Sequence, residues 1–451
     1  MADRRPVRDW RRRRSPFASF LHSNRILFGS VLFSLLTSIF VAIHLGFFST
    51  LLVYTPLVVI CIPAFTVLEA ADYKNMHVWS KRRRVRFAVC FGWSLFLLFA
   101  PTYPTSGRSS YMNSNSPLPV LRSSNSGNAT AYFIAANLHD YGAHLPVWTK
   151  QISLLIRYLG SDNVFVSIYE SNSHDSTKDL LRNFESQLRW GGVRNRVLME
   201  DDDRRREGWQ SNGHERVWYM ADMRNKALEP LQEGLRGRRF DKIIFFNDVF
   251  FEWKSIVRLL DTKGGDFDLA CGLDFDGIGL YDTWVIRDSC GQRTKEIWPY
   301  FSDPVAIDTL RREEPIEVAT CWNGVAVFDA NWFLPPTTPR SVPPGPLLAF
   351  RADTPCAESE CFTISYDMHV RTAPKRPRIY VNPQVNVAYT PHNWLYYGKL
   401  KHLSMTRPWR VVWEDWIAHR MFGWVSDRFW LKEKACAFES EGIVKAEHCL
   451  I

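Results

Sequence analysis

Three apolar runs dominate the first hundred residues. Residues 26–48 and 50–68 carry no formal charge and are each long enough to cross a bilayer, and a shorter run covers residues 87–100. Clusters of Arg and Lys precede the first and third runs, and positively charged loops stay on the cytosolic side. The pattern predicts a cytosolic tail over residues 1–25 and a membrane region over residues 26–105 with three transmembrane helices. A single span is the alternative, and it places the bulk of the chain on the same, lumenal side.

A polar segment follows these runs. Two long runs in tandem, with no small-residue cleavage site, argue against a cleaved signal peptide. Residues 106–130 are rich in Ser, Asn, Gly and Pro, a composition typical of flexible linkers. The segment also contains the glycosylation sequon Asn128-Ala129-Thr130. We therefore expect a flexible lumenal stem.

From residue 131 onward, strand-like and helix-like patterns alternate. The expected strands cover residues 131–137, 163–169, 240–246, 268–273 and 324–328. The expected helices cover residues 145–159, 175–190, 216–232 and 361–371. Strands that alternate with helices of this length predict a parallel α/β sheet. We expect one folded domain over residues 131–393, with the Trp-rich residues 394–451 packed against it.

Composition narrows the class of protein. The chain of 451 residues is 46% hydrophobic, which is ample for a core. Much of its net charge of +9 comes from the basic membrane flanks, so we expect no nucleic-acid partner. Of its nine cysteines, Cys61 and Cys90 lie in the membrane region, and the spacings of the others match no zinc motif. In an oxidising lumen these are expected to form disulfides with one left over, in a connectivity that the sequence leaves open.

An acidic side chain stands where a strand is expected to end. The tripeptide Asn247-Asp248-Val249 follows the strand-like run 242–246. Open α/β sheets bind ligands beyond the carboxyl ends of their strands, and a carboxylate there can hold Mg²⁺ or Mn²⁺ against a diphosphate. One carboxylate suffices where phosphate oxygens and water complete the metal shell. The plain alternative is an Asp that caps the next turn.

Other residues are candidates for an additional ligand of this metal or for a rival metal site. His369 is a candidate second ligand, although a lone His is often structural. Asp274-Phe275-Asp276 is the rival metal site, and we assign it instead to sugar or acceptor recognition. The run 200–203 (Glu-Asp-Asp-Asp) is interpreted as a solvated turn, because like charges disfavour a packed metal site.

Two further segments resemble motifs of GT-A glycosyltransferases. The segment 170–177 resembles the Asp-Asp-Gly-Ser-x-Asp-x-Thr loop, whose first acidic residue contacts the nucleotide and is matched by Glu170. Arg224-Asn225 resembles the Ala-Arg-Asn helix that precedes the metal-binding strand of such enzymes. The resemblance implies that Glu170, Arg224, Asn225 and Asn247 bind the donor, with Arg224 placed to contact phosphate.

The order of motifs over roughly residues 130–390 resembles one family closely. The motifs are Phe245-Phe246-Asn247-Asp248-Val249, Gly272-Leu273-Asp274-Phe275-Asp276-Gly277, the segment 281–288, Cys321-Trp322-Asn323-Gly324, Glu360-Cys361 and Ser365-Tyr366-Asp367-Met368-His369. This order is similar to that of the fungal α-1,3-mannosyltransferase family that includes the cryptococcal capsule-associated proteins. The resemblance implies a GT-A-like, Rossmann-type mixed sheet with helices on both faces, preceded by transmembrane helices. It also implies transfer with retention from GDP-mannose to a mannose-containing glycan, dependence on Mn²⁺ or Mg²⁺, and a Golgi membrane location.

The resemblance also suggests roles for single residues. Asp248 is expected to hold the metal together with His369, and Glu360 and Asp367 are candidates for stabilising the positive sugar ring. The residues expected to contact sugar or acceptor are Asp274, Asp276, Asp282, Trp284, Trp322 and Asn323. Either Trp can equally be a core residue. Two alternatives stay open, namely a non-catalytic glycan-binding or polysaccharide-secretion factor and a GT-A enzyme that uses a UDP-sugar.

Overall fold

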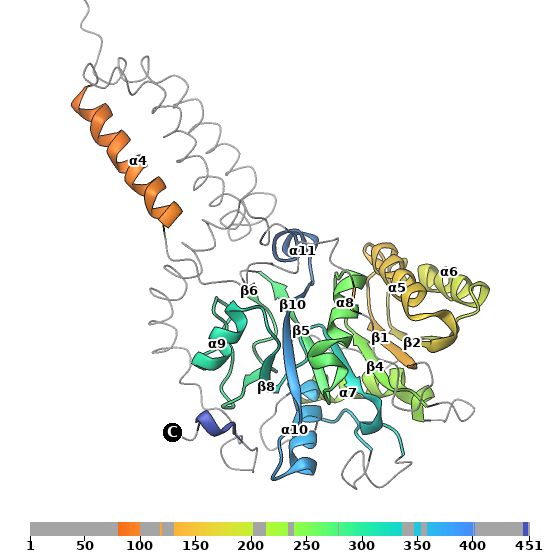
Figure 1. Ribbon diagram of the computed structural model, residues 1–451. Helices are drawn as coiled ribbons and strands as arrows, with labels where there is room; N and C mark the ends of the chain where they lie inside the picture. Colours follow the sequence, from red (N-terminus) through yellow and green to blue (C-terminus); the bar gives the residue numbers. More distant parts are fainter. Residues whose placement is uncertain are drawn as a thin grey trace, which may run out of the picture. The chain divides into compact units, whose positions relative to one another are not determined.

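The computed structural model describes most of the folded domain and one helix before it (Figure 1). The described residues are 80–99, 118–119, 130–201, 213–232, 239–277, 279–335, 347–352, 359–399, 401 and 445–449. The first two apolar runs, the basic tail, and most of the stem and of the Trp-rich extension lie outside them. Residues 87–99 of the third apolar run lie in helix α4 (Lys81–Phe99). No helix in the described ranges has both the length and the apolar character needed to cross a membrane.

A ten-stranded mixed sheet forms the centre of the domain. Its strands are β1 (Tyr132–Leu138), β2 (Val164–Ser171), β3 (Arg194–Glu200), β4 (Lys242–Phe246), β5 (Leu269–Asp276), β6 (Gly279–Leu280), β7 (Arg287–Asp288), β8 (Ile316–Thr320), β9 (Val325–Asp329) and β10 (Ile379–Ala388). The order is β3-β2-β1-β4-β9-β5-β10-β8-β7, with β6 paired to β5. Strands β1 to β4 are mutually parallel where they pair, whereas β9 runs antiparallel to both β4 and β5.

Helices cover both faces of this sheet. Helices α5 (Leu145–Leu159), α6 (Thr177–Trp190) and α8 (Trp253–Leu260) share one apolar cluster with alternate residues of β1, β2 and β4. Helices α7 (Gly213–Gln232) and α10 (Glu360–Thr372) contact each other, and α7 meets the opposite face of β2, where Lys226 reaches Tyr169. Two further α-helices in the described part of the domain are α9 (Pro304–Arg311) and α11 (Pro391–Gly398). The mixed sheet with helices on both faces is therefore confirmed.

Helix α5 shows why the local sequence folds as it does. Its buried residues, Leu145, Trp148, Ile152, Leu155, Ile156 and Leu159, recur at the helical spacing that places one apolar stripe against the sheet. A proline opens the helix, and Gly160, with φ of 89°, ends it. The indole of Trp148 meets Phe246 and Phe251 edge to face, with centroids 6.0 and 6.4 Å apart. This packing holds the end of β4, which carries Asp248.

Two disulfides join distant parts of the domain. Cys271 on β5 is bonded to Cys321, and Cys290 is bonded to Cys449 near the carboxyl terminus. Cys361 is a buried, free thiol. These pairs supply the connectivity that the sequence left open, for the cysteines that the structure describes.

Candidate active site

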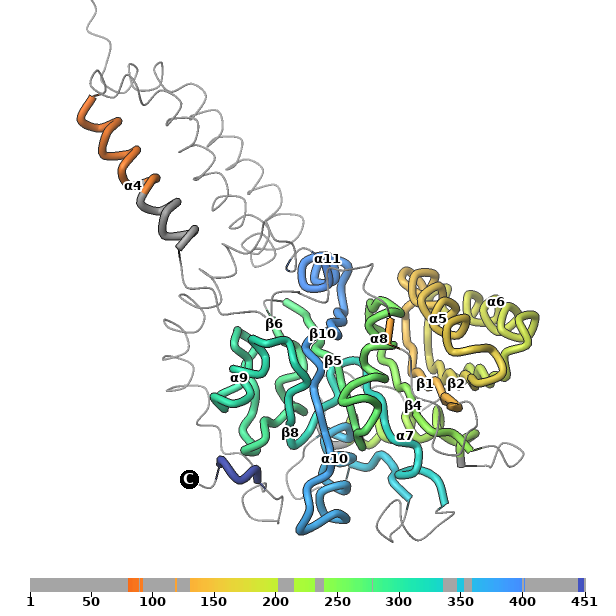
Figure 2. Tube along the Cα trace, in the orientation of Figure 1, coloured from red at the N-terminus to blue at the C-terminus, as the bar shows by residue number. Residues whose placement is uncertain are grey.

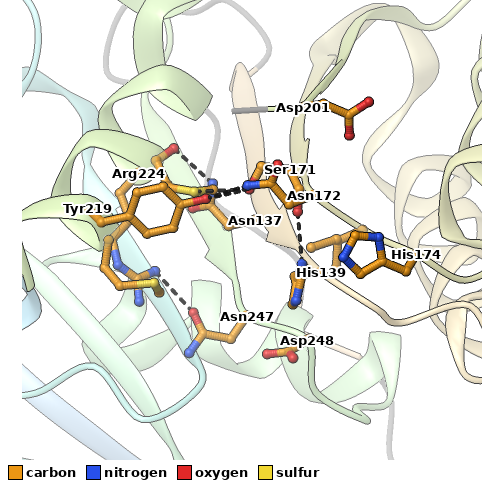
Figure 3. Close-up of a pocket in the computed structure, with 13 residues that line it drawn as sticks. Asn137, His139, Ser171, Asn172, His174, Asp201, Tyr219, Arg224, Asn247 and Asp248 are labelled. Atoms are coloured by element: carbon orange, nitrogen blue, oxygen red, sulfur yellow. Dashed lines mark hydrogen bonds between the residues drawn. The ribbon is translucent and has the colours of Figure 1, made fainter. Parts of the chain in front are cut away.

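A cavity of about 660 Å³ lies at the carboxyl ends of β1, β2 and β4 and beside α7 (Figure 3). Its lining consists of Asn137, Leu138, His139, Ser171, Asn172, His174, Asp201, Tyr219, Met220, Met223, Arg224, Asn247 and Asp248. Strands β1, β2 and β4 are separate in the sequence but run side by side (Figure 2). The chain runs outward from β1 through β2 to β3 and then returns to β4 on the other side of β1. The cavity thus occupies a topological switch point, where open α/β sheets bind ligands.

Asp248 reaches this cavity on a backbone that is fixed on two sides. Asn247 donates its N–H to the Gly324 carbonyl at 2.9 Å. Phe250 donates to Ala388 at 2.7 Å and accepts from it at 3.1 Å. These bonds tie the end of β4 to β9 and β10, so the Asp248 carboxylate lines the cavity from a held position.

The side chain of Asn247 is held by three partners from three parts of the fold. Its Oδ1 accepts from Arg224 Nη1 at 3.1 Å and from Trp322 Nε1 at 3.2 Å. Its Nδ2 donates to the Tyr389 hydroxyl at 3.1 Å. Asn247 therefore joins α7, the turn before β9 and the end of β10 at the cavity wall, and its polar atoms are largely committed to the protein.

Arg224 sits in a buried ion pair beneath the cavity. Its Nε donates to Glu360 Oε1 at 2.9 Å, and its guanidinium lies 4.2 Å from the ring centre of Trp322. Desolvation by burial opposes the charge, yet the neighbouring Cys361 and Glu360 leave the pKa of Arg224 raised. Arg224 lines the cavity as expected of a donor-binding residue, but Glu360 balances much of its charge.

Several predicted residues lie away from the cavity lining. The side-chain amide of Asn225 donates through Nδ2 to the Phe350 carbonyl at 2.8 Å and accepts through Oδ1 from the Phe350 N–H at 2.9 Å. Asp367 is paired with Arg351, at 2.8 and 3.1 Å. Trp322 is only 2% exposed, so its faces pack inside the protein and do not meet solvent. The structure brings none of these three to the cavity.

The side chain predicted to contact the nucleotide, Glu170, and the one predicted to bind the metal, His369, are both buried. Glu170 is fully buried and accepts from the Ser173 N–H at 2.8 Å, which shapes the loop after β2. His369 is 1% exposed, and its Nε2 lies 2.9 Å from the Ala319 carbonyl. Burial lowers the pKa of His369 to about 4, so the ring is neutral. The cavity lining includes neither side chain.

A pair of carboxyl groups lies near the cavity on the β5 side. Asp274 Oδ1 accepts from Asn323 Nδ2 at 3.0 Å and from the Asp282 N–H at 3.2 Å. Burial and the neighbouring Asp282 raise the pKa of Asp274 to about 7. Burial, with a contribution from Glu360, raises the pKa of Asp282 to about 6. Each of these carboxyl groups therefore keeps its proton to a higher pH than an ordinary carboxyl group does.

Tyr389 connects this carboxyl pair to the cavity wall. Its hydroxyl bonds to Asn247, and burial together with Asp274, Asp248 and Asp282 holds the pKa of Tyr389 well above its usual value. Asp276 and Trp284, which were also predicted to contact sugar, are not part of the cavity lining. Asp276 accepts from Asn393 Nδ2 at 2.9 Å, and Trp284 is 43% exposed.

The sequence interpretation missed several residues that line the cavity. His139 and His174 follow β1 and β2, and Tyr219 lies on α7. Asp201, which was expected in a solvated acidic turn, has 80% of its side chain exposed, pairs with Lys178 and also lines the cavity. The signal available in the sequence was position, because each of His139, His174 and Asp201 stands just after an expected or actual strand.

An α/β domain with a carboxylate-bearing cavity at the switch point of its sheet has the layout of a nucleotide-binding enzyme domain. Residues 131–367 match the model of the family described as Cryptococcal mannosyltransferase 1. The match covers more than half of the chain, and the protein belongs to this family.

One curated relative is the alpha-1,3-mannosyltransferase CMT1 of Cryptococcus neoformans var. neoformans serotype D. The two are 28% identical over 295 residues, which cover 60% of this chain and 59% of the relative. The chain thus spans less than two-thirds of that protein's length.

Similarity to solved structures is weaker. The mannosyltransferase PcManGT from Pyrobaculum calidifontis, in complex with GDP-Man and Mn²⁺, has a TM-score of 0.34 at 10% identity, over 62% of this chain and 61% of that one. The S. aureus protein TarS 1–349, in complex with UDP, has a TM-score of 0.31 at 8% identity, over 63% of this chain and 70% of that one. Scores this low carry no argument about the site.

Proposed function

We propose that the protein is a membrane-anchored glycosyltransferase that transfers mannose from GDP-mannose to a mannose-containing glycan, with retention and in α-1,3 linkage. Family membership supports mannosyl transfer, and the name of the cryptococcal relative supports the linkage. The observation that carries the proposal is the position of Asp248. It lines a cavity at the switch point of the sheet, within the residues that the family model matches.

The donors in this cavity fit a hard divalent cation such as Mn²⁺ or Mg²⁺. Asp248 and Asp201 offer carboxylates, and His139 and His174 offer imidazoles. Among the described residues of the cavity, no three such groups place their ligand atoms within 4.8 Å of one another, so diphosphate oxygens and water would complete the shell. When bound, the cation neutralises charge on the departing diphosphate.

The chain's own residues would divide the remaining work. Arg224 faces the phosphates as a cation whose position Glu360 and Asn247 fix. Asp282 would accept hydrogen bonds from hydroxyls of the acceptor, near the exposed rings of Tyr281 and Trp284, whereas Asp274 is fully buried and accepts from the Asp282 N–H. Retaining transfer needs no dedicated general base, and we assign none.

A membrane-bound, lumenal location in the Golgi completes the proposal. The uncharged runs over residues 26–48 and 50–68 support anchorage, and the basic residues before them support a cytosolic amino terminus. The disulfides Cys271–Cys321 and Cys290–Cys449 agree with an oxidising compartment.

A donor screen tests the proposal. Full-length protein in detergent would be incubated with radiolabelled sugar nucleotides, mannobiose acceptors and either Mn²⁺ or Mg²⁺, followed by linkage analysis of the product. We expect transfer from GDP-mannose that a chelator abolishes. Transfer from a UDP-sugar alone would replace the donor assignment. Binding of nucleotide or glycan without turnover for any donor would favour the non-catalytic alternative.

A further inference from the structure

We propose that Asn247 is a positioning residue whose neutral amide holds Arg224 in place and leaves its positive charge available to the diphosphate of the donor. Tyr389 and Trp322 fix the orientation of this amide. The inference rests on the proposed function and deepens it. Asn247, predicted from its position to bind the donor, acts in this account through Arg224, and Tyr389, which no motif marked, gains a role.

The partners of Asn247 determine which way its amide points. Arg224 Nη1 and Trp322 Nε1 lie 3.1 and 3.2 Å from Oδ1. Guanidinium and indole N–H groups only donate hydrogen bonds, so the amide oxygen must face both of them. The amide nitrogen then donates to the Tyr389 hydroxyl at 3.1 Å. Exchanging the two amide atoms would place an N–H group against two other donors, so the neighbours permit one orientation.

These partners are themselves held by the fold. The ring of Trp322 is buried, with its centre 4.2 Å from the Arg224 guanidinium. The ring of Tyr389 packs against Tyr281, with centroids 4.6 Å apart. Arg224 and Asn247 both line the cavity, and Figure 3 shows the bond that joins them. Asn247 therefore connects the guanidinium on α7 to the residue that follows β10.

The neutrality of Asn247 matters because Arg224 already faces a carboxylate. Glu360 Oε1 lies 2.9 Å from Arg224 Nε, and both side chains are almost wholly buried. Burial raises the pKa of Asp282 to about 6, and Glu360 and Arg224 also act on it, so a further carboxyl group lies within their electrostatic reach. An Asp at position 247 would add a negative charge at hydrogen-bond distance from the guanidinium. The donor diphosphate would then meet net negative charge next to Asp248, which the neutral amide avoids.

Ligand binding tests the inference separately from turnover. Isothermal titration calorimetry of full-length protein in detergent, with saturating Mn²⁺, would measure the affinity for GDP and for guanosine, which lacks phosphate. Asn247→Asp keeps the shape of the side chain, and its oxygens can accept from Arg224, Trp322 and the Tyr389 hydroxyl. We expect GDP affinity to fall about tenfold or more, because a charge is added beside the guanidinium. Guanosine affinity should stay unchanged.

A second variant tests the orientation of the amide without adding a charge. Tyr389→Phe keeps the ring that packs against Tyr281 and removes the acceptor of the Asn247 N–H. We expect GDP affinity to fall by about three- to tenfold, again with no change for guanosine. Tyr158→Phe is the matched control, because it removes a hydroxyl bonded to the Pro119 carbonyl, and it should change neither affinity. Thermal unfolding would confirm that the variants are folded.

The outcomes separate this inference from the proposed function. Unchanged GDP affinity in either folded variant would overturn the inference and leave the proposed function standing. Equal losses for GDP and guanosine would overturn it too, because the substitution would then disturb the whole cavity. Tighter GDP binding by Asn247→Asp would show that the position acts on the cation, which also contradicts the inference. If the wild type binds neither GDP nor guanosine, the donor assignment of the proposed function falls with it.

Discussion

The Arg224–Glu360 ion pair is almost wholly buried, with 4% and 7% of the two side chains exposed. Removing one partner leaves an uncompensated buried charge, which costs about 3–5 kcal/mol. We expect Arg224→Ala to lower the free energy of unfolding by about this amount, measured by denaturant titration. Arg312, which pairs with Asp308 on the exposed surface, is the matched control and should change stability little. If Arg224→Ala and the substitution of Arg312 lower the free energy of unfolding equally, the buried ion pair contributes no more to stability than the exposed one.

A substitution of Asp248 tests the chemistry of the cavity without changing the stability of the protein. Asp248→Asn keeps the shape of the side chain and removes the charge that a hard cation requires. Loss of several kcal/mol of transition-state stabilisation corresponds to at least about a hundredfold lower kcat. Steady-state transfer assays would measure it, with an unchanged unfolding transition as the check on folding. If turnover and metal dependence stay near the wild-type level, Asp274 with Asp276 becomes the leading metal site.

The raised pKa of Asp274, about 7, predicts a pH effect of definite sign. An unfolded Asp titrates near pH 3.9. Between about pH 4 and pH 7 the folded protein keeps a proton that the unfolded chain releases, so this group's contribution to stability falls as the pH rises. Asp274→Asn cannot ionise and should lose less stability than the wild type across that window. Urea unfolding at stepped pH measures the difference between the two proteins, and a flat difference would contradict the raised pKa.

The sequence located Asp248 because a strand end is visible in a single chain. It did not locate His139 or Tyr389, because their significance depends on which strand ends the sheet brings together. Asn225 and His369 were predicted to bind ligands but do not line the cavity. Their residue types suit a binding role, yet tertiary packing directs both to backbone carbonyls. Residue type and spacing thus identified candidates, and burial decided among them.

At the scale of elements, prediction succeeded where hydrophobic spacing was regular. Residues 145–159 form α5 with the predicted ends. Strand β3 was missed because Arg194–Glu200 is polar and only partly buried at the edge of the sheet. Strand β10 was missed because its interior contains a proline and its pairing with β5 shifts register between Val381 and Asn386. The alternation of strands and helices predicted a parallel sheet, which holds for β1 to β4, but β9 is antiparallel to both of its neighbours.

The turn before β9 makes a prediction of its own. Gly324 has a φ of +72°, and a Cβ there would lie 3.0 Å from Val249 Cγ1 and from Val387 Cγ2. Gly324→Ala should therefore cost backbone strain plus overpacking, the latter about 1–3 kcal/mol. Gly192 has a similar φ of +70° with nothing within 4 Å, so Gly192→Ala bears the backbone cost alone. Denaturant unfolding of the two variants should separate them, and equal losses would show that the space around Gly324 yields.

Gly324 also touches the site, because its carbonyl accepts the N–H of Asn247. A shift of this turn would move the end of β4 with its Asp248 carboxylate. At the scale of the whole molecule, this hydrogen bond means that strands outside the cavity help to position Asp248. The cavity is formed by β1, β2 and β4, but β9 and β10 fix the backbone beside Asp248. Long-range pairing of this kind cannot be obtained from local patterns in a single sequence.

The orientation of the chain in the membrane is the prediction for the whole molecule. Basic residues before the first and third apolar runs should keep residues 1–25 and 69–86 in the cytosol and place everything beyond about residue 105 in the lumen. Sealed microsomes treated with protease should then protect the carboxyl-terminal domain, and detergent should abolish the protection. Asn128 would be open to glycan addition on that side, so a glycosidase should increase gel mobility in the wild type and not in Asn128→Gln. The glycan test depends on use of that one sequon, whereas protease protection does not. Digestion of the domain from the cytosolic side of intact vesicles would therefore contradict the proposed orientation. It would also contradict the expectation that the disulfides form in an oxidising lumen.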